Sequence, residues 1–543
     1  MSSATPVLIV GASPTGPALA GDLGWRGIPA LVVERGDGSI YQPRQDLVGV
    51  RTMEFCRRWG IARWVEESPY PRDYPQDCVY ATSLNGYELG RERLPSMDGG
   101  QPPPQSPQRR ERCPQDMFDP ILARHARSFP HVSLRYGTEL VDLEESSEGV
   151  TATVRDTDTG APATIHADYV VGCDGGSSKV RSLLGIGMSG RPALTYTTNV
   201  IFRCEDLVAL HDKGEAYRFI FIGPEGTWAT LVAINGADRW RMSIIGGDEE
   251  HALSEQDIDA AIRRAVGRDF AYEVLSVVPW VRHELVADSY GGSRVFIAGD
   301  AAHLMSPTGG FGMNTGVGDA VDLSWKLAAV LGGWGGASLL ESYELERRPV
   351  AIRNVTEASG NLRRMLSPRD EPLDAVFEPG PEGELARKEF GERYSDVMRR
   401  EWFCLGIHLG YRYDDSPICW SDGTPAPPDE VMNYEQTARP GARAPHVWIG
   451  ESRSTLDLYG HGFTLLRLGD DAPTATGIAD AAGARGIPLS VVALPDREVL
   501  EAYERRLVLV RPDGHVAWRS DEEPDVPGAL VELATGHAGS LPA

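Results

Sequence analysis

Apolar runs that end in glycine-rich turns and lead into helical patterns recur along the chain. The first run is V-L-I-V from Val7, followed by a glycine turn, a helical pattern over residues 17–26 and a second apolar run over 28–33. This order predicts a parallel βαβ unit. Apolar stretches that begin at Ala167 and at Arg294 repeat the strand and the turn. The pattern therefore predicts an α/β fold built on a parallel sheet.

Residues 191–285 and the last hundred residues follow different patterns. In 191–285, β-branched and aromatic runs are bounded by glycine and proline, with a helical stretch at 254–266, which predicts an inserted sheet. Near the end, strand, helix, strand and a hairpin turned at Pro512-Asp513-Gly514 predict a thioredoxin-like fold. This part has no C-x-x-C pair, so we expect a structural role or a subunit contact rather than redox chemistry.

Composition excludes several classes of protein. The chain has 543 residues and a net charge of −25, which argues against nucleic-acid binding. No run approaches the roughly 18 consecutive apolar residues of a membrane span, and the first apolar run is too short for a secretory signal. The seven cysteines contain no C-x-x-C pair, which suits a reducing compartment and gives no zinc site. We therefore expect a cytoplasmic protein with no metal, nucleic-acid or membrane partner.

The first glycine turn has the spacing of a dinucleotide-binding fingerprint, with one departure. The pattern G-x-G-x-x-G falls on Gly11, Ser13 and Gly16, so serine replaces the central glycine. Amides at the start of the following helix suit a pyrophosphate, and Glu34 at the end of the next strand suits an adenosine ribose. Such a fingerprint alone also fits an ordinary strand-to-helix turn, so the interpretation depends on the turns further along the chain.

The three turns together resemble a known family. The chain is similar to class A flavoprotein monooxygenases of the phenol hydroxylase and aromatic polyketide hydroxylase branch. The likeness is carried by the first turn, by Asp174-Gly175, by Gly299-Asp300 and by S-Y-E-L-E-R-R-P-V from Ser342. It implies a Rossmann-like, three-layer FAD-binding domain, an inserted β-sheet substrate domain and a C-terminal thioredoxin-like domain.

Shifts in pattern and the resemblance together predict the domain limits. The FAD-binding domain is expected in three parts, 1–75, 108–190 and 286–400, the last with the G-D motif and linker helices. The substrate domain is expected as an excursion at 76–107 and a β-rich part at 191–285. Residues 401–543 are expected to form the C-terminal thioredoxin-like domain without C-x-x-C.

The resemblance also implies which residues bind FAD. It places Glu34 at the adenosine ribose, Arg44 at the pyrophosphate, Gln115 and Asp300 at the ribityl chain, and Asp174 at both FAD and the nicotinamide. NADPH or NADH is implied as a transient co-substrate without a dedicated domain. The expected cofactor residues are Gly11, Ser13, Pro14, Thr15, Gly16, Glu34, Arg35, Arg44, Gln115, Asp174, Gly299, Asp300, Pro307, Gly310, Gly312, Met313 and Asn314.

The implied chemistry is oxygen transfer to an aromatic ring. FAD is reduced by NAD(P)H, reacts with O₂ to a C4a-hydroperoxyflavin and delivers hydroxyl to an electron-rich aromatic carbon, while the second oxygen leaves as water. A closed apolar pocket would keep water from the hydroperoxide. By the same resemblance the inserted sheet supplies the pocket wall. The aromatic candidates are Tyr217, Phe219, Trp228 and Trp240, and an ordinary place in the core of the sheet is the alternative for each.

Asp46 is the candidate catalytic base. It stands five residues before Arg51 of R-T-M-E, as the catalytic aspartate of phenol hydroxylase stands before its arginine, whereas chlorophenol hydroxylases carry histidine there. To deprotonate a phenol well, Asp46 would need a pKa raised by burial. A helix cap or a surface charge is the alternative. His303 is a rival base, but D-A-A-H recurs in the family regardless of substrate, which favours a structural role.

Three functions follow from these patterns. We expect an NAD(P)H-dependent flavoprotein monooxygenase that hydroxylates a small phenolic substrate, as a monomer or homodimer. Baeyer–Villiger or other oxygenation of an aromatic polyketide on the same scaffold is the alternative. A non-catalytic flavin- or nucleotide-binding protein is the third possibility, and flavin colour and NAD(P)H oxidation would distinguish it.

Overall fold

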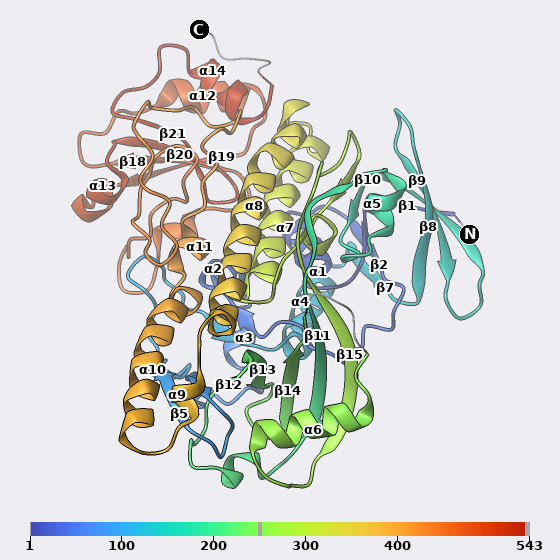
Figure 1. Ribbon diagram of the computed structural model, residues 1–543. Coiled ribbons are helices and arrows are strands. Elements are labelled where there is room, and N and C mark those ends of the chain that lie inside the picture. The colour runs from blue at the N-terminus through green and yellow to red at the C-terminus, as the bar shows by residue number, and fades with distance from the viewer. Residues whose placement is uncertain (1, 248–251, 538–543) are drawn as a thin grey trace.

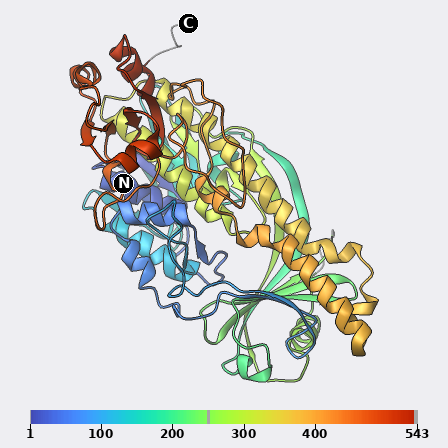
Figure 2. The ribbon, with the colours of Figure 1, turned by 90° about the vertical axis from the view of Figure 1, so that its left-hand side faces the viewer.

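The computed structural model describes residues 2–247 and 252–537. Two large sheets and a smaller C-terminal sheet surround a set of long helices (Figure 1). In the view of Figure 2 the yellow and orange helices run diagonally from the C-terminal sheet toward the second sheet. The α/β architecture with an inserted sheet and a thioredoxin-like end confirms the fold class predicted from the sequence. Among the described residues, no helix combines the length and the apolar character needed to cross a membrane.

The first sheet has seven strands. Five run parallel in the order β7, β2, β1, β10, β16, and the hairpin β8–β9 joins the start of β10 in antiparallel fashion. The bounds are β1 Ser2–Val10, β2 Ala30–Val33, β7 Val132–Arg135, β8 Thr138–Glu145, β9 Val150–Asp156, β10 Pro162–Gly172 and β16 Val295–Ile297.

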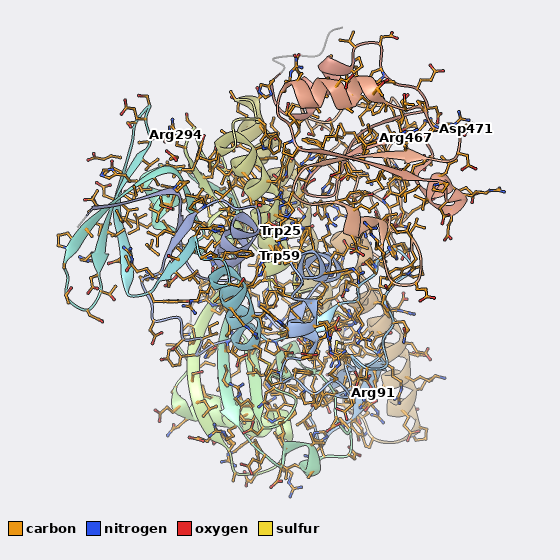
Figure 3. The ribbon with its side chains drawn as sticks, turned by 180° about the vertical axis from the view of Figure 1, so that it is seen from behind. Trp25, Trp59, Arg91, Arg294, Arg467 and Asp471 are labelled. Atoms are coloured by element: carbon orange, nitrogen blue, oxygen red, sulfur yellow. The ribbon has the colours of Figure 1, made fainter. Side chains whose placement is uncertain are left out.

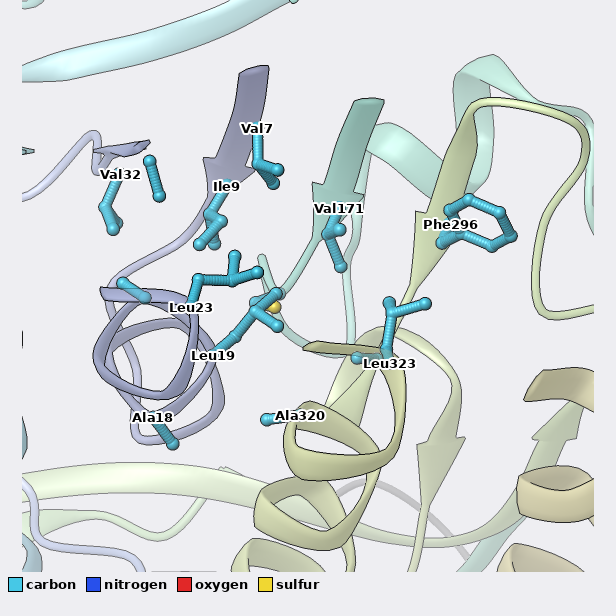
Figure 4. Close-up of a cluster of buried hydrophobic side chains, with 14 of the residues drawn as sticks. Val7, Ile9, Ala18, Leu19, Leu23, Val32, Val171, Phe296, Ala320 and Leu323 are labelled. Carbon is cyan, nitrogen blue, oxygen red and sulfur yellow. The ribbon is translucent and has the colours of Figure 1, made fainter. Parts of the chain in front are cut away.

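Apolar side chains hold helices against this sheet. Figure 4 shows Leu19 and Leu23 of α1 pointing toward Ile9 of β1, with Leu323 of α7 below Val171 of β10. The parallel strands are apolar along their whole central length because both of their faces are covered. The helices of this part are α1 Thr15–Trp25, α2 Val50–Arg58, α3 Ala62–Glu66, α4 Gln115–Arg127, α5 Lys179–Leu183, α7 Phe311–Leu331 and α8 Ser338–Leu366.

The second sheet has eight strands in the order β17, β15, β11, β14, β13, β12, β4, β5. Helix α6 packs on its outer face, and α10 packs along β5. The strands are β4 Cys78–Ala81, β5 Glu88–Glu92, β11 Met188–Arg203, β12 Arg218–Gly223, β13 Gly226–Ala233, β14 Arg239–Ile245, β15 Glu273–Ala287 and β17 His303–Leu304. The helices are α6 Glu255–Val266, α9 Asp374–Phe377, α10 Gly380–Trp402 and α11 Leu405–Leu409, and β3 Leu47–Val48 pairs with β6 Glu111–Arg112.

The C-terminal sheet has the order β19, β18, β20, β21. Strands β18 and β19 are parallel, and β20 and β21 are antiparallel to their neighbours, which is the thioredoxin-like arrangement. Its elements are β18 Phe463–Leu468, α12 Thr476–Ala484, β19 Leu489–Leu494, α13 Arg497–Tyr503, β20 Leu507–Val510, β21 Val516–Ser520 and α14 Pro527–Ala534.

Buried ion pairs join the C-terminal sheet to the rest of the molecule. Arg443 is almost fully buried, and its Nε donates to Glu54 Oε2 of α2 at 3.0 Å. Arg51 pairs with the same oxygen at 2.7 Å and donates to the Asp513 carbonyl at 2.9 Å. Arg511 donates to Glu346 of α8 at 2.9 Å. The R-T-M-E motif therefore binds the C-terminal domain with its Arg51 and Glu54.

Aromatic contacts add to this junction. Trp25 of α1 stacks on His461 with ring centroids 3.8 Å apart, and Trp59 Nε1 donates to Asp22 of α1 at 2.6 Å. Figure 3 shows Trp25 and Trp59 next to each other in the middle of the molecule. Helices α1 and α2 are thus fixed to each other and to the C-terminal domain.

Glu54→Gln should destabilise the protein strongly. The variant leaves Arg51 and Arg443 buried without their carboxylate, and removal of one partner of a buried pair costs about 3–5 kcal/mol. We expect the free energy of unfolding to fall by about that amount, measured by urea unfolding followed by circular dichroism. In the control, Glu67→Gln at the exposed Arg63–Glu67 pair, the change should stay below about 1 kcal/mol. Equal stability of the two variants would contradict the role of Glu54.

Candidate active site

A cavity of about 1320 Å³ lies between the first two sheets. Its wall includes Gly11 and Cys173 at the carboxyl ends of β1 and β10, and Thr230 and Arg241 on the inner face of the second sheet. Ligands of open parallel sheets bind beyond these strand ends. The cavity therefore brings the three glycine-rich turns together with the inserted sheet.

The first turn requires its outer glycines. Gly11 has a φ of +105°, and a Cβ there would lie 2.3 Å from the Cys173 carbonyl oxygen. A Cβ at Gly16 would lie 2.0 Å from the Gly11 oxygen, so this glycine lets α1 approach the turn. The Ser13 hydroxyl donates to the Cys173 carbonyl at 3.2 Å. The departure from the fingerprint is thus accommodated, because the backbone of the neighbouring strand satisfies the serine.

Several predicted cofactor residues line the cavity while their polar atoms bind the protein backbone. Glu34 accepts hydrogen bonds from the Ala12 amide at 2.9 Å and the Gly36 amide at 2.7 Å. Asp174 accepts from the Lys179 amide at 2.6 Å and so caps α5. These carboxylates fix the turns, and they remain at the cavity wall.

Arg44, Gln115 and Asp300 also line the cavity. The Gln115 side-chain oxygen Oε1 accepts from the Arg44 backbone amide at 3.0 Å, and the Arg44 guanidinium lies 5.0 Å from the centre of the Trp280 ring. Asp300 is exposed to the cavity, and desolvation by the surrounding protein raises the pKa of its carboxyl.

The third turn forms another part of the wall. It precedes the 21-residue helix α7, whose first amides lack helical partners and favour negative charge. Of the predicted cofactor residues, the cavity is lined by Gly11, Ser13, Pro14, Thr15, Glu34, Arg35, Arg44, Gln115, Asp174, Asp300, Pro307, Gly310, Gly312 and Met313.

Gly16, Gly299 and Asn314 were also predicted to bind the cofactor, but they lie behind the wall. A Cβ at Gly299 would lie 2.4 Å from Thr15 Oγ1, so this glycine permits close packing. Asn314 Oδ1 accepts from the Gly49 amide at 2.7 Å, and its Nδ2 donates to the Gly310 carbonyl at 2.8 Å. These residues hold the turns in place, and their direct contact with the cofactor stays a prediction.

Asp46 lies in the wall, but its electrostatic surroundings differ from the expectation. It pairs with Arg112 at 3.0 Å and with Arg241 at 3.1 Å, and the Tyr217 side chain is close enough to influence its pKa. Burial acts to raise the pKa of Asp46, but the two guanidinium groups outweigh it and hold this pKa below its usual range. Asp46 therefore lacks the raised pKa that an efficient base for a phenol would need, because two arginines from distant strands stabilise its carboxylate.

Only one of the four predicted pocket aromatics lines the cavity. Tyr217 does, and the Arg112 guanidinium lies 3.6 Å from the centre of its ring. Phe219, Trp228 and Trp240 instead pack in the core beneath α6 on the outer face of the sheet. The expectation that these three form the pocket wall is corrected. Because successive side chains of a strand point to opposite faces, the residues adjacent in sequence to these three point to the inner face.

The cavity also contains residues that the sequence patterns did not single out. Gln45 lies between Arg44 and Asp46, and both of its side-chain polar atoms are buried without a protein partner. Arg282 and Glu401 each have one such atom. Gln45 has a sequence signal, since it sits inside the candidate loop, but Arg282 and Glu401 have none.

His303 is not in the cavity wall. It is fully buried, and its Nε2 lies 2.7 Å from Asp319, which also pairs with Arg347 at 2.8 Å. This contact agrees with the structural role favoured for His303.

The wall fits a flavin dinucleotide. Its glycine-rich turn abuts the start of α1, an anionic pyrophosphate would meet the amides there, and Gln45 and Asp300 offer polar atoms along the same cavity. Comparison with known families agrees. Residues 4–358 match the FAD binding domain family, and residues 437–539 match the aromatic-ring hydroxylase C-terminal family. The chain belongs to the FAD-dependent aromatic-ring hydroxylases.

Relatives over the full length are consistent with this family. A putative polyketide hydroxylase of Streptomyces halstedii is 34% identical over 98% of this chain and 96% of its own. A 4-methyl-5-nitrocatechol 5-monooxygenase of Burkholderia is 32% identical over 97% of this chain and 96% of its own. The structure of chromopyrrolic acid-soaked RebC with bound 7-carboxy-K252c superimposes with a TM-score of 0.92 at 40% identity, covering 99% of this chain and 100% of that chain. The protein is a FAD-dependent monooxygenase.

Gly11→Ala should abolish FAD binding, because the added methyl group would meet the Cys173 backbone and the residue would be strained at its φ. We expect purified Gly11→Ala to lack the flavin absorbance that the parent protein shows, measured as the ratio of visible to protein absorbance. Ser13→Gly is the matched control and should remain yellow, since it removes only a hydroxyl bound to backbone. A yellow Gly11→Ala protein would argue against this FAD site.

Proposed function

We propose that the protein hydroxylates a phenolic aromatic substrate at the expense of NAD(P)H and O₂, in the cavity between the third glycine turn and the inserted sheet. The observation that carries the proposal is that Asp46, paired with Arg112 and Arg241, and Tyr217 line the same cavity and interact electrostatically. When bound, FAD supplies the transfer of electrons from NAD(P)H to O₂ and of one oxygen atom to the ring.

In this proposal Tyr217 and Asp46 accept the phenolic proton of the substrate in two successive transfers. During the reaction the Tyr217 hydroxyl would give its proton to the neighbouring Asp46 carboxylate, while a lone pair of the tyrosine oxygen accepts the hydroxyl proton of the substrate. As that proton reaches Tyr217, the tyrosine proton passes to Asp46. Arg112 and Arg241 keep Asp46 ionised as the acceptor, and their charge also stabilises a phenolate beside them.

A second candidate is Baeyer–Villiger or other oxygenation of an aromatic polyketide. The lowered pKa of Asp46 favours this reaction, since a carboxylate held by two arginines is a weak base and such a substrate requires no deprotonation of a phenol. The likeness to the putative polyketide hydroxylase of Streptomyces halstedii supports a polyketide as the substrate of this second candidate.

A substrate screen tests the proposed function. The yellow protein is mixed with NADH or NADPH and a panel of phenols, hydroxybenzoates and fused-ring phenols, and cofactor oxidation is followed by absorbance. We expect at least one phenol to accelerate oxidation and to gain one oxygen, located by mass spectrometry and NMR. Ring-expanded or ring-opened products would favour the second candidate. A yellow protein that oxidises neither nicotinamide with any compound would favour a non-catalytic flavin protein. Size-exclusion chromatography distinguishes a monomer from a homodimer.

Asp46→Ala and Tyr217→Phe should lower kcat by about 10²–10⁴-fold each, the usual contribution of a proton-transferring group. Because the two residues act on one proton, the double variant should be no slower than the slower single variant. In the parent, the rate of substrate-dependent oxygen uptake should show no change caused by Asp46 titration at pH values above the usual pKa of a carboxyl group, since the pKa of Asp46 is lowered. An unchanged rate and profile in Asp46→Ala would remove Asp46 from the mechanism.

A further inference from the structure

Two charged side chains that line the same cavity each have one buried atom without a hydrogen-bond partner. Within the described residues, Glu401 Oε2 and Arg282 Nη1 have no hydrogen-bond partner, and both side chains line the cavity. Each residue is only 4% exposed. Buried polar atoms without partners are costly, so two of them on side chains that line one cavity indicate a ligand that satisfies them.

Glu401 is held in place by its other oxygen. It lies in the last turn of α10, and its Oε1 accepts from Arg218 Nη1 at 2.8 Å and from the Gly309 amide at 3.1 Å. Gly309 belongs to the third glycine turn, next to Gly310 of the cofactor wall. Glu401 therefore binds the third glycine turn with one carboxylate oxygen, and its other oxygen stays without a partner.

Arg282 is held in the same manner from β15. Its Nε donates to Thr197 Oγ1 of β11 at 3.2 Å, which leaves Nη1 unpartnered. Burial, together with the charge of neighbouring Arg218, lowers the pKa of Arg282 to about 10, while Glu401 acts in the opposite direction. Its positive charge is thus incompletely compensated by the protein.

The wall around these residues carries an excess of positive charge. Arg112 and Arg241 are matched by Asp46, and Arg218 is matched by Glu401. Arg110 also lines the cavity, and its Nη1 donates to the Trp402 carbonyl at 3.1 Å. An anionic group on the ligand would balance the charge that remains at Arg110 and Arg282.

We propose that Glu401 and Arg282 form a two-point substrate clamp, in which Glu401 Oε2 accepts an O–H or N–H of the substrate and Arg282 Nη1 donates to an anionic oxygen of the same molecule. The substrate class is then an aromatic carboxylate that also carries a hydrogen-bond donor. This inference rests on the proposed function of the same cavity and adds the chemical class of its substrate. Glu401 also ties the substrate position to the third glycine turn through Gly309.

Binding of four naphthalene probes tests the clamp on the FAD-loaded protein. The probes are 3-hydroxy-2-naphthoate, its methyl ester, 2-naphthoate and 2-naphthol, and binding is followed by the change in flavin absorbance. We expect 3-hydroxy-2-naphthoate to bind about tenfold to a hundredfold more tightly than the ester or 2-naphthoate, the ratio typical of a hydrogen bond to a charged group.

Two variants assign the two contacts. Glu401→Gln keeps an oxygen for Gly309 and Arg218, and it should remove the preference for the hydroxyl group while retaining FAD. Arg282→Met, which removes a buried charge and leaves the fold intact, should remove the preference for the carboxylate. Glu392→Gln, on an exposed part of α10, is the matched control and should bind all four probes as the parent does.

The outcomes separate this inference from the proposed function. A yellow, NAD(P)H-oxidising protein that binds the ester as tightly as the acid, or that binds none of the probes at millimolar concentration, overturns the clamp and leaves the proposed function standing. Unchanged preferences in both variants overturn it equally. Failure to oxidise NAD(P)H with any phenol contradicts the proposed function, whereas the binding preferences are measured without turnover.

Discussion

The close approach of three backbone segments around Thr15 is the constraint on which the rest of the structure depends. A Cβ at Gly299 or at Gly316 would lie within 2.5 Å of Thr15 Oγ1, and one at Gly11 would meet the Cys173 carbonyl. Residues some 300 positions apart are therefore packed so tightly that side chains are excluded between them. This contact fixes the strand ends of the first sheet at one point, and the cavity begins there.

Buried ion pairs occur both at the junction with the C-terminal domain and in the cavity. At the domain junction, Arg443 and Arg511 of the C-terminal domain are buried against carboxylates of α2 and α8. In the cavity, Asp46 is surrounded by arginines from β6 and β14, and Glu401 meets an arginine from β12. The fold thus uses buried guanidinium groups both to join domains and to set the charge of the active site, because arginine keeps its charge when buried.

The sequence predicted the features that depend on local order. Strand, glycine turn and helix are adjacent in the chain, so the FAD-binding turns and the C-terminal fold could be inferred. The lowered pKa of Asp46 could not be, since Arg112 and Arg241 lie 66 and 195 residues away. Nor could the face of Trp240, because alternation along a strand does not tell which side is the cavity. Glu401 had no motif, and only its unpartnered oxygen marks it.

The ion pairs of Arg443 and Arg511 give the thioredoxin-like domain, which has no C-x-x-C pair, a structural role in the whole molecule. Each half of the chain holds counter-ions for the interior of the other, with Arg51 reaching the Asp513 carbonyl from the opposite direction. If the chain were cut between the two halves, one fragment would keep carboxylates and the other guanidinium groups, each without its ion-pair partner. The two regions have the sequence patterns of separate domains, but each depends on charged groups of the other, so together they form one structural unit.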